Sequence, residues 1–210
     1  MGAPGYVTHR LALPGGDLRL FQPSEAAELP DEGPIEWAPV APYWAVIWRS
    51  GVALAQELDE AELSGLRVVE LGCGLGVPSL VAARRGASVL STDESAEALE
   101  LLERNARENG LALQTACVDW NAPDQLVDRG PFDLVLAADV LYERSSVAPL
   151  LSLMRRLGAE AWIADPGRPA APAFLEGARR DWSVHRRERD GVRINRLRHA
   201  QRSTRRPPGP

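Results

Sequence analysis

The chain has 210 residues, 45% of them apolar, and a formal net charge of −5, which suits one globular domain with a substantial core. No apolar run approaches the roughly 20 residues that span a bilayer, and the first ten residues lack the apolar segment of a secretory signal. Two cysteines, Cys73 and Cys117, are too few for a disulfide framework or a structural zinc site. We therefore expect a cytoplasmic monomer with no metal and no membrane association.

Charge is unevenly distributed along the chain. All 24 basic residues are arginine, and lysine is absent. From Arg179 onward there are 11 arginines and 3 acids, a net charge of +8, which leaves −13 for residues 1–178. The acidic body argues against a broad nucleic-acid-binding face. The basic end favours a solvated tail, with contact to an acidic partner or RNA as the alternative.

The first 42 residues predict a hairpin and a wrapping loop. Residues 9–21 form two short alternating runs around Pro-Gly-Gly, a pattern typical of a β-hairpin. Residues 22–42 are rich in proline and acids, which indicates a loop. The segment PYWAVIWRSG, residues 42–51, leads into an amphipathic helix that we expect to end near Leu63.

Strands and helices alternate through the rest of the chain. Runs rich in Val, Leu and Ala predict buried parallel strands at 67–71, 88–92, 113–118, 132–138 and 161–165. Helices are predicted at 77–85, 95–109, 145–157 and 171–180. Asp190-Gly191 is a strong hairpin-turn dipeptide and predicts a C-terminal antiparallel hairpin of residues 182–189 and 192–200. The fold class is therefore α/β, with helices on both faces of a mostly parallel sheet and a tail over residues 201–210.

The segment ELGCGLG joins the first predicted strand to a helix. Its glycines, Gly72, Gly74 and Gly76, let the backbone turn sharply and approach a ligand where a Cβ would collide. The third glycine comes one residue too early for the dinucleotide-binding fingerprint. Together with Glu70 before it and Asp93 after the next strand, the segment resembles motif I of class I, S-adenosylmethionine-dependent methyltransferases.

An acid stands at the carboxyl end of nearly every predicted strand, where ligands bind in open α/β sheets. These acids are Glu70, Asp93, Asp119, Asp139 and Asp165. A single acid at such a turn often serves only as a helix N-cap. Five together favour an acidic crevice, which suits a cofactor with a sulfonium and an ammonium and a substrate that arrives as a cation.

Position in the fold predicts a role for each of the cofactor-binding acids. We expect Asp93 to accept hydrogen bonds from both ribose hydroxyls, as the acid of dinucleotide-binding folds does. Asp119 is expected to accept the adenine amino group, with Trp120 either against the ring or in the core. Glu70 is expected to order the glycine loop and the methionyl amine. Cys73, a small filler rather than a nucleophile, and Ala138 complete this set with the three glycines.

Two further segments are similar to the seven-strand protein-lysine methyltransferases. Asp139-Val140-Leu141-Tyr142 resembles their acid-x-x-Tyr motif after the fourth strand. Residues 42–51 resemble the segment before motif I in the electron-transfer-flavoprotein β-subunit lysine methyltransferases, and Asp165-Pro166-Gly167-Arg168 matches a turn of their bacterial relatives. The resemblance covers residues 42–197. It implies a Rossmann-like, seven-stranded sheet, with residues 43–200 as the methyltransferase domain.

The resemblance also implies roles for individual residues. Asp139 and Tyr142 are expected to be catalytic, Trp48 to line the cofactor pocket, and Tyr43, Trp44 and Asp165 to form a substrate channel. Plainer explanations exist for each. Trp44 and Trp48 lie four residues apart, a spacing typical of core packing on one helical face, Tyr142 would pack under the next helix, and Asp165-Pro166-Gly167 would be only a turn.

The implied reaction is in-line transfer of the sulfonium methyl to a lysine amine. Lysine has an unperturbed pKa of about 10.4, so the site must bind the ammonium, let it lose a proton and orient the neutral amine. Asp139 would hold the cation, and proximity would supply several kcal/mol. The three histidines (His9, His185 and His199) lie outside the motifs, which leaves bulk water to take the proton.

Three other functions are compatible with these motifs to different degrees. A small-molecule amine N-methyltransferase would use the same cofactor and a similar acid-x-x-Tyr turn. A nucleic-acid methyltransferase is disfavoured because neither Asn-Pro-Pro-Tyr nor Asp-Pro-Pro-Tyr follows the fourth strand. A non-catalytic cofactor-binding partner protein is disfavoured by the intact motif I and by Asp139, because the site rather than the fold decides activity.

Overall fold

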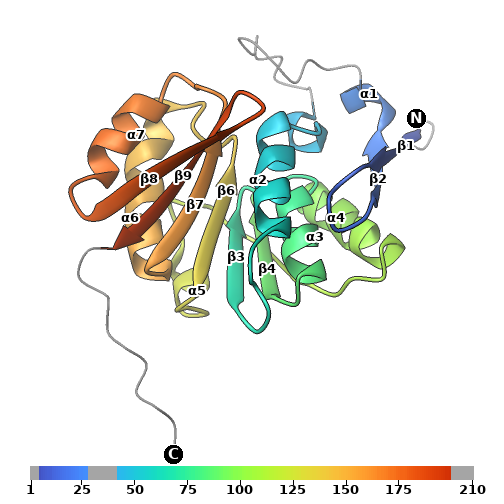
Figure 1. Cartoon of the computed structure of the whole chain (residues 1–210), viewed down its shortest axis with the longest axis horizontal. Coiled ribbons are helices and arrows are strands. Elements are labelled where there is room, and N and C mark those ends of the chain that lie inside the picture. Colours follow the sequence, from blue (N-terminus) through green and yellow to red (C-terminus); the bar gives the residue numbers. More distant parts are fainter. Residues whose placement is uncertain (1–4, 28–41, 200–210) are drawn as a thin grey trace, which may run out of the picture.

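The computed structural model describes residues 5–27 and 42–199, and consists of a mixed β-sheet with helices on both faces (Figure 1). The tail expected at 201–210 and most of the loop expected at 22–42 lie outside the described residues. The seven strands of the sheet follow the order β5-β4-β3-β6-β7-β9-β8. All neighbours are parallel except those of β9, which is antiparallel to both β7 and β8. This order confirms the α/β fold with a C-terminal antiparallel hairpin.

The five parallel strands begin and end within two residues of their predicted bounds. They are Arg67–Leu71 (β3), Ser88–Asp93 (β4), Gln114–Cys117 (β5), Leu134–Ala138 (β6) and Glu160–Asp165 (β7). Successive side chains point to opposite faces of a strand, and both faces of the central strands are apolar. Val68 accordingly packs in one hydrophobic cluster, whereas Val69 and Leu71 pack in the other. The near-continuous apolar runs of the sequence reflect this burial on two sides.

The helices divide between the two faces of the sheet. The cluster on one face includes side chains of Arg49–Asp59 (α2), Val77–Arg84 (α3) and Ala96–Glu108 (α4). The cluster on the other includes side chains of Asp124–Val127 (α5), Val147–Leu157 (α6) and Ala171–Ala178 (α7). The structure corrects two expectations: α2 ends at Asp59 rather than near Leu63, and the short helix α5 was not predicted. The terminal hairpin consists of Trp182–Arg189 (β8) and Val192–His199 (β9).

A separate antiparallel hairpin, Tyr6–Leu11 (β1) and Leu18–Pro23 (β2), lies beside α4 (Figure 1). Two asparagine side chains of α4 bind the backbone of β2. Asn105 accepts from the Phe21 amide at 2.8 Å and donates to its carbonyl at 3.3 Å, and Asn109 does the same with Arg19 at 2.9 and 2.7 Å. Four residues of helix rise about 6 Å and two residues of strand about 6.6 Å, so the two spacings match. Ser24–Ala27 (α1), a helical turn inside the expected loop, follows β2.

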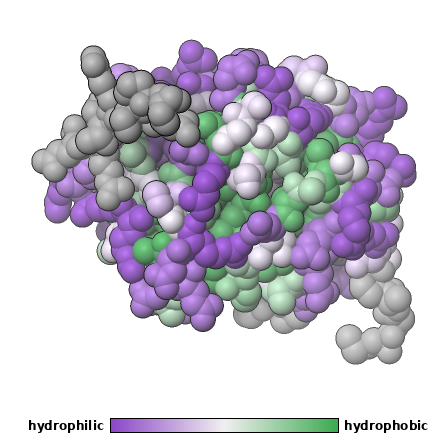
Figure 2. Space-filling model, turned by 90° about the horizontal axis from the view of Figure 1, so that it is seen from below, coloured by the Kyte–Doolittle hydropathy of each residue, from purple (hydrophilic) through white to green (hydrophobic). Residues whose placement is uncertain are grey.

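Seen from below the view of Figure 1, hydrophilic residues dominate the periphery of the molecule and apolar residues gather near its middle (Figure 2). Among the described residues, no helix is long and apolar enough to cross a membrane. Both cysteines are free thiols, with Cys73 buried and Cys117 exposed.

The strand order positions the site. From β3 the chain proceeds outward to β4 and β5, and then returns to the other side of β3 with β6 and β7. At such a reversal the loops after neighbouring strands leave in opposite directions and open a crevice at the carboxyl ends of the strands. Three acids that the sequence singled out lie at these carboxyl ends: Glu70 near the end of β3, Asp93 at the end of β4, and Asp139 directly after β6.

Candidate functional site

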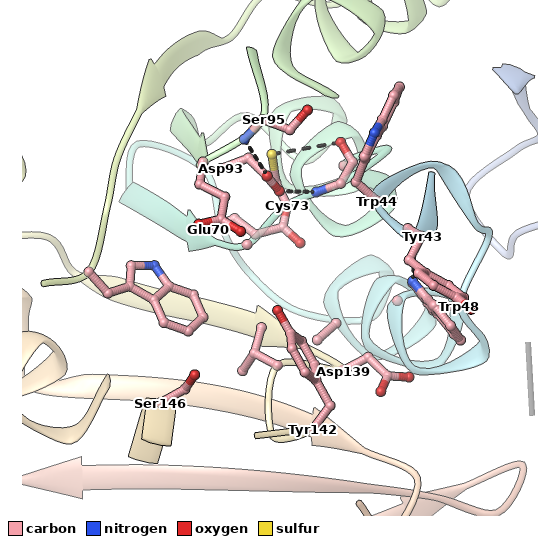
Figure 3. A pocket seen from close by; sticks show the side chains of 18 of the residues that line it. Tyr43, Trp44, Trp48, Glu70, Cys73, Asp93, Ser95, Asp139, Tyr142 and Ser146 are labelled. Atoms are coloured by element: carbon pink, nitrogen blue, oxygen red, sulfur yellow. Dashed lines mark hydrogen bonds between the residues drawn. The ribbon is translucent and has the colours of Figure 1, made fainter. Parts of the chain in front are cut away.

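A cavity of about 550 Å³ lies at this reversal, a volume typical of small-molecule sites. All of the predicted site residues except Asp165 line it: Tyr43, Trp44, Trp48, Glu70, Gly72, Cys73, Gly74, Gly76, Asp93, Asp119, Trp120, Ala138, Asp139 and Tyr142. Figure 3 shows Glu70 and Asp93 on one side of the cavity, and Asp139 and Tyr142 on the other. Arg168 also lines the cavity, although the sequence did not assign it to the site.

The glycine loop forms the floor of the cavity in a conformation that other residues adopt only with strain. Gly74 and Gly76 have φ angles of 51° and 69°, in the left-handed region. A Cβ on Gly74 would lie 2.6 Å from the backbone carbonyl oxygen of Trp44. Helix α3 begins directly after Gly76. The loop therefore needs glycine for its turn and for its close approach to the segment before α2.

Asp93 ties the glycine loop to the next helix. Its Oδ2 accepts from the Gly74 amide at 2.8 Å, and its Oδ1 accepts from the Ser95 amide at 3.0 Å. Ser95 in turn caps α4, because its hydroxyl accepts from the amide of Ala98 at 3.2 Å. Burial raises the pKa of Asp93. The carboxylate thus has a structural role of its own beside the predicted contact with ribose.

Glu70 is buried at the end of β3, where its Oε2 accepts from both the amide and the hydroxyl of Ser79 in α3. Burial raises the pKa of Glu70 to about 8; the two Ser79 hydrogen bonds act in the opposite direction, and the nearby Asp93 contributes to the increase. A buried carboxyl with such a pKa is mostly protonated at neutral pH. It will ionise when a cation is placed beside it.

Asp119 and Trp120, which come shortly after β5, also line the cavity. Asp119 is exposed, and its Oδ1 accepts from the backbone and side-chain nitrogens of Asn121 at 2.8 and 2.9 Å. Trp120 is half-buried, packs against the second hydrophobic cluster and also lines the cavity. A Cβ on Gly72 would lie 3.4 Å from the Trp120 ring. Trp120 therefore packs in the core and also forms part of the cavity wall, so the two explanations do not exclude each other.

Asp139 occupies a strained and closely held position after β6. Its φ of 61° is left-handed, which costs a residue with a Cβ about 1–2 kcal/mol. Its Oδ2 accepts from the Ser50 hydroxyl at 3.1 Å, and its Oδ1 accepts from Arg168 Nε at 2.5 Å. The Arg168 guanidinium carbon also lies 5.3 Å from the centre of the Trp48 ring. Strain that neighbouring side chains hold in place in this way is common at functional sites.

Asp165 has a different place from the one expected. It is buried behind the cavity, and its Oδ1 accepts from the amides of Gly167 and Arg168 at 2.8 and 3.1 Å. It therefore shapes the turn that carries Arg168, and does not line the channel. The Asp-Pro-Gly-Arg turn was visible in the sequence, but the residue of this turn that lines the cavity is the arginine.

Aromatic side chains form the rim of the cavity. Tyr142 is 39% exposed, and its pKa is raised to about 12 by burial and then by Glu94, Glu143 and other nearby carboxylates. Trp44 lies in a short 3-10 helix, Tyr43–Ala45, and Trp48 precedes the first residue of α2. The explanation of their spacing as one helical face is therefore wrong. Trp48 instead donates its indole N–H to the Tyr43 carbonyl at 3.2 Å.

Comparison with known proteins identifies the family. A family model described as lysine methyltransferase matches residues 42–162. The chain is 37% identical over 120 residues to protein N-lysine methyltransferase METTL21A of Danio rerio, a match that covers 54% of this chain and 55% of that protein. It is 34% identical over 169 residues to the electron transfer flavoprotein beta subunit lysine methyltransferase of Danio rerio, covering 77% and 64%. The chain thus spans somewhat more than half the length of these curated relatives.

Solved structures share the fold. The T. thermophilus 16S rRNA methyltransferase RsmC, solved with AdoMet and guanosine, matches with a TM-score of 0.68 at 14% identity, over 94% of this chain and 51% of that one. At that identity the likeness concerns the fold alone. Because the family model matches more than half of its residues, and the relative at 34% identity covers 77% of it, the chain belongs to the lysine methyltransferase family.

Proposed function

We propose that this protein is an S-adenosylmethionine-dependent N-methyltransferase that methylates a lysine side chain of another protein. The observation that carries the proposal is the cavity at the sheet reversal. It combines a glycine cradle and buried carboxyls on one side with an exposed tyrosine among carboxylates on the other. The relatives named for lysine methylation support the choice of acceptor.

The residues on the first side fit the cofactor. The cradle at Gly74 is a place that a Cβ would fill, and the carboxylate of Asp93 is fixed at its edge. In the proposed arrangement Asp93 binds the ribose hydroxyls, Asp119 accepts the adenine amino group, and Glu70 lies beside the methionyl ammonium. When bound, the cofactor supplies a methyl group already activated by its sulfonium.

The residues on the second side fit an amine that arrives as a cation. The phenol of Tyr142 lies within the electrostatic influence of Glu94, Glu143, Asp93 and Asp139, so a lysine ammonium that reaches the rim is attracted there. Among the described residues, no histidine lines the cavity, and the proton of the ammonium passes to solvent water. The chain contributes position and orientation, which are worth several kcal/mol.

The two free thiols also support action in a reducing compartment such as the cytoplasm. A protein acceptor is preferred to a small amine because Tyr142 and Glu143 are exposed where the cavity meets solvent. This geometry leaves room for a side chain that is still attached to its own protein.

The experiment that tests the proposal combines purified protein, methyl-labelled cofactor and a dialysed lysate. Asp139→Asn is assayed beside the parent, and Asp128→Ala, an exposed acid outside the cavity, serves as the matched control. Labelled bands are hydrolysed, and the methylated amino acid is identified. Because this chain contains no lysine, labelled methyl-lysine must come from another protein.

The expected result is a discrete labelled band that contains methyl-lysine, persists with Asp128→Ala and is lost with Asp139→Asn. A lysate that becomes labelled only when the removed metabolites are restored would assign the activity to a small amine instead. Binding of the cofactor without labelling in either fraction would contradict an enzymatic function.

A further inference from the structure

The resemblance to the family assigns Asp139 to bind the substrate cation. In this protein, however, Asp139 already forms an ion pair with Arg168. Arg168 Nε and the Ser50 hydroxyl each donate to a different oxygen of this carboxylate, at 2.5 and 3.1 Å. Asp139 and Arg168 come from the loops after β6 and β7, which are neighbouring strands of the sheet. The charge of Asp139 is therefore neutralised within the protein, before any substrate arrives.

This pair is a fixed part of the wall. The side chains of Arg168 and Asp139 are only 9% and 4% exposed, and removal of one partner from a buried ion pair is strongly unfavourable because it leaves the other charge unpaired. The backbone on both sides is also held, by the left-handed turn at Asp139 and by the Asp165 turn beneath Arg168. An incoming ammonium would have to displace the Arg168 guanidinium, which already donates a hydrogen bond to Asp139.

The other charges around the cavity are all of the opposite sign. Among the described residues that line it, Arg168 is the only one with a cationic side chain. The acids of the lining are Glu70, Asp93, Glu94, Asp119, Asp139 and Glu143. Glu94 and Glu143 flank Tyr142 at the rim, where an ammonium is attracted, whereas the Asp139–Arg168 pair is neutral as a unit.

We propose that Arg168 is a positioning residue that neutralises and orients Asp139, so that the inner end of the acceptor site holds an uncharged amine rather than an ammonium. This inference rests on the proposed function and deepens it. The acidic rim captures the cation, and the neutral pair further in favours loss of its proton to the water at the rim. Asp139 then accepts a hydrogen bond from the neutral amine without restoring its positive charge.

The test compares two ligands that differ by one cationic group. S-adenosylhomocysteine lacks the methyl group, whereas sinefungin carries an amine on the carbon that replaces the sulfur, in the place of that methyl. The ratio of their dissociation constants, measured by calorimetry, reports how the site responds to an ammonium beside Asp139. Because the ratio cancels losses common to both ligands, a general structural defect does not change it.

Three variants give different expected ratios. Arg168→Gln leaves Asp139 unpaired and should raise the preference for sinefungin at least about 10-fold, the effect of roughly one favourable charge contact. Arg168→Lys keeps the charge and should behave like the parent. Asp139→Asn removes the negative charge of the pair and keeps that of Arg168, so it should lower the preference for sinefungin by about 10-fold. This change has the opposite sign, and it does not depend on whether the Arg168→Gln protein folds.

The outcomes separate the inference from the proposed function. A parent protein that does not bind S-adenosylhomocysteine would contradict the proposed function, and the inference would fail with it. Binding in the parent with equal ratios in Arg168→Gln, Asp139→Asn and the parent would overturn the inference alone. Ratios that move in opposite directions in the two variants would support it.

Discussion

The buried carboxyl of Glu70 should make cofactor binding sensitive to pH. Its pKa of about 8 in the ligand-free protein means that roughly 90% of the molecules carry a proton there at pH 7. In the proposed complex, the ammonium of the cofactor lies beside this group and favours its ionised form. Binding at pH 7 should therefore release close to one proton, at a cost on the order of 1 kcal/mol that the new ion pair must exceed.

The measurement is calorimetric titration with S-adenosylhomocysteine at pH 7 in two buffers of different ionisation enthalpy. The parent should release close to one proton, and its affinity should increase about 10-fold per pH unit from pH 6 to 7, below the Glu70 pKa. Glu70→Gln should release almost none and show a flat profile over this range. Asp93, whose pKa is also raised by burial, is unchanged in this variant, so the difference between the two proteins reports Glu70.

The same shift predicts the stability of the ligand-free protein. The pKa of Glu70 is raised from an ordinary value of 4.5 to about 8 on folding, so its contribution to stability is full below about pH 4.5 and is lost as the pH rises through 8. Thermal unfolding should therefore show a loss of stability between about pH 5 and 8 in the parent that is smaller in Glu70→Gln and levels off above pH 8. Equal proton release by the two proteins, or equal pH dependence of unfolding, would refute the assignment of this pKa to Glu70.

Three further substitutions test the glycine loop, the acid expected to bind ribose, and a buried ion-pair cluster outside the cavity. Gly74→Ala should destabilise the protein by about 2–3 kcal/mol, because of the left-handed φ and a clash with the Trp44 carbonyl. Gly110→Ala, at a similar φ but in open space, should cost about 1 kcal/mol in the same thermal unfolding measurement. Equal losses in the two variants would contradict the clash. Asp93→Asn should weaken S-adenosylhomocysteine binding about 10- to 100-fold by calorimetry, and an unchanged affinity would remove Asp93 from the ribose site. Glu57→Gln, which deprives three arginines of a buried partner, should lower the urea unfolding free energy by about 2 kcal/mol, whereas a change below about 0.5 kcal/mol would class it with exposed pairs.

The parts of the fold that the sequence predicts well are those with strong local signals. The parallel strands are buried on both faces, so their apolar runs are continuous and their ends are marked by glycine or an acid. The short helix α5 lacks such a signal, because only Leu126 among its residues is buried. The end of α2 was missed because the chain turns after Asp59 while apolar residues continue to Leu63, which joins the same hydrophobic cluster.

The residues of the site likewise differ in how well the sequence alone predicts them. Residues at the carboxyl end of a strand, such as Glu70 and Asp93, could be assigned to the cavity because strand order places those ends together. The pairing of Asp139 with Arg168 spans 29 residues, and neither periodicity nor spacing in one sequence reports such a contact. Trp44 and Trp48 had a helical spacing, but Val46 between them adopts an extended backbone with ψ of 138°, so that spacing was misleading.

The N-terminal hairpin is attached through its main chain as well as through the buried side chains of Leu18 and Leu20, so its exposed side chains are free to change. Asn105 and Asn109 bind the main chain of β2, which every non-proline residue presents in the same form. The side chains of the two strands can therefore be exchanged without loss of these hydrogen bonds. The exposed surface of the hairpin can in this way change without change in the body of the protein, while two asparagines of α4 keep the hairpin in its place.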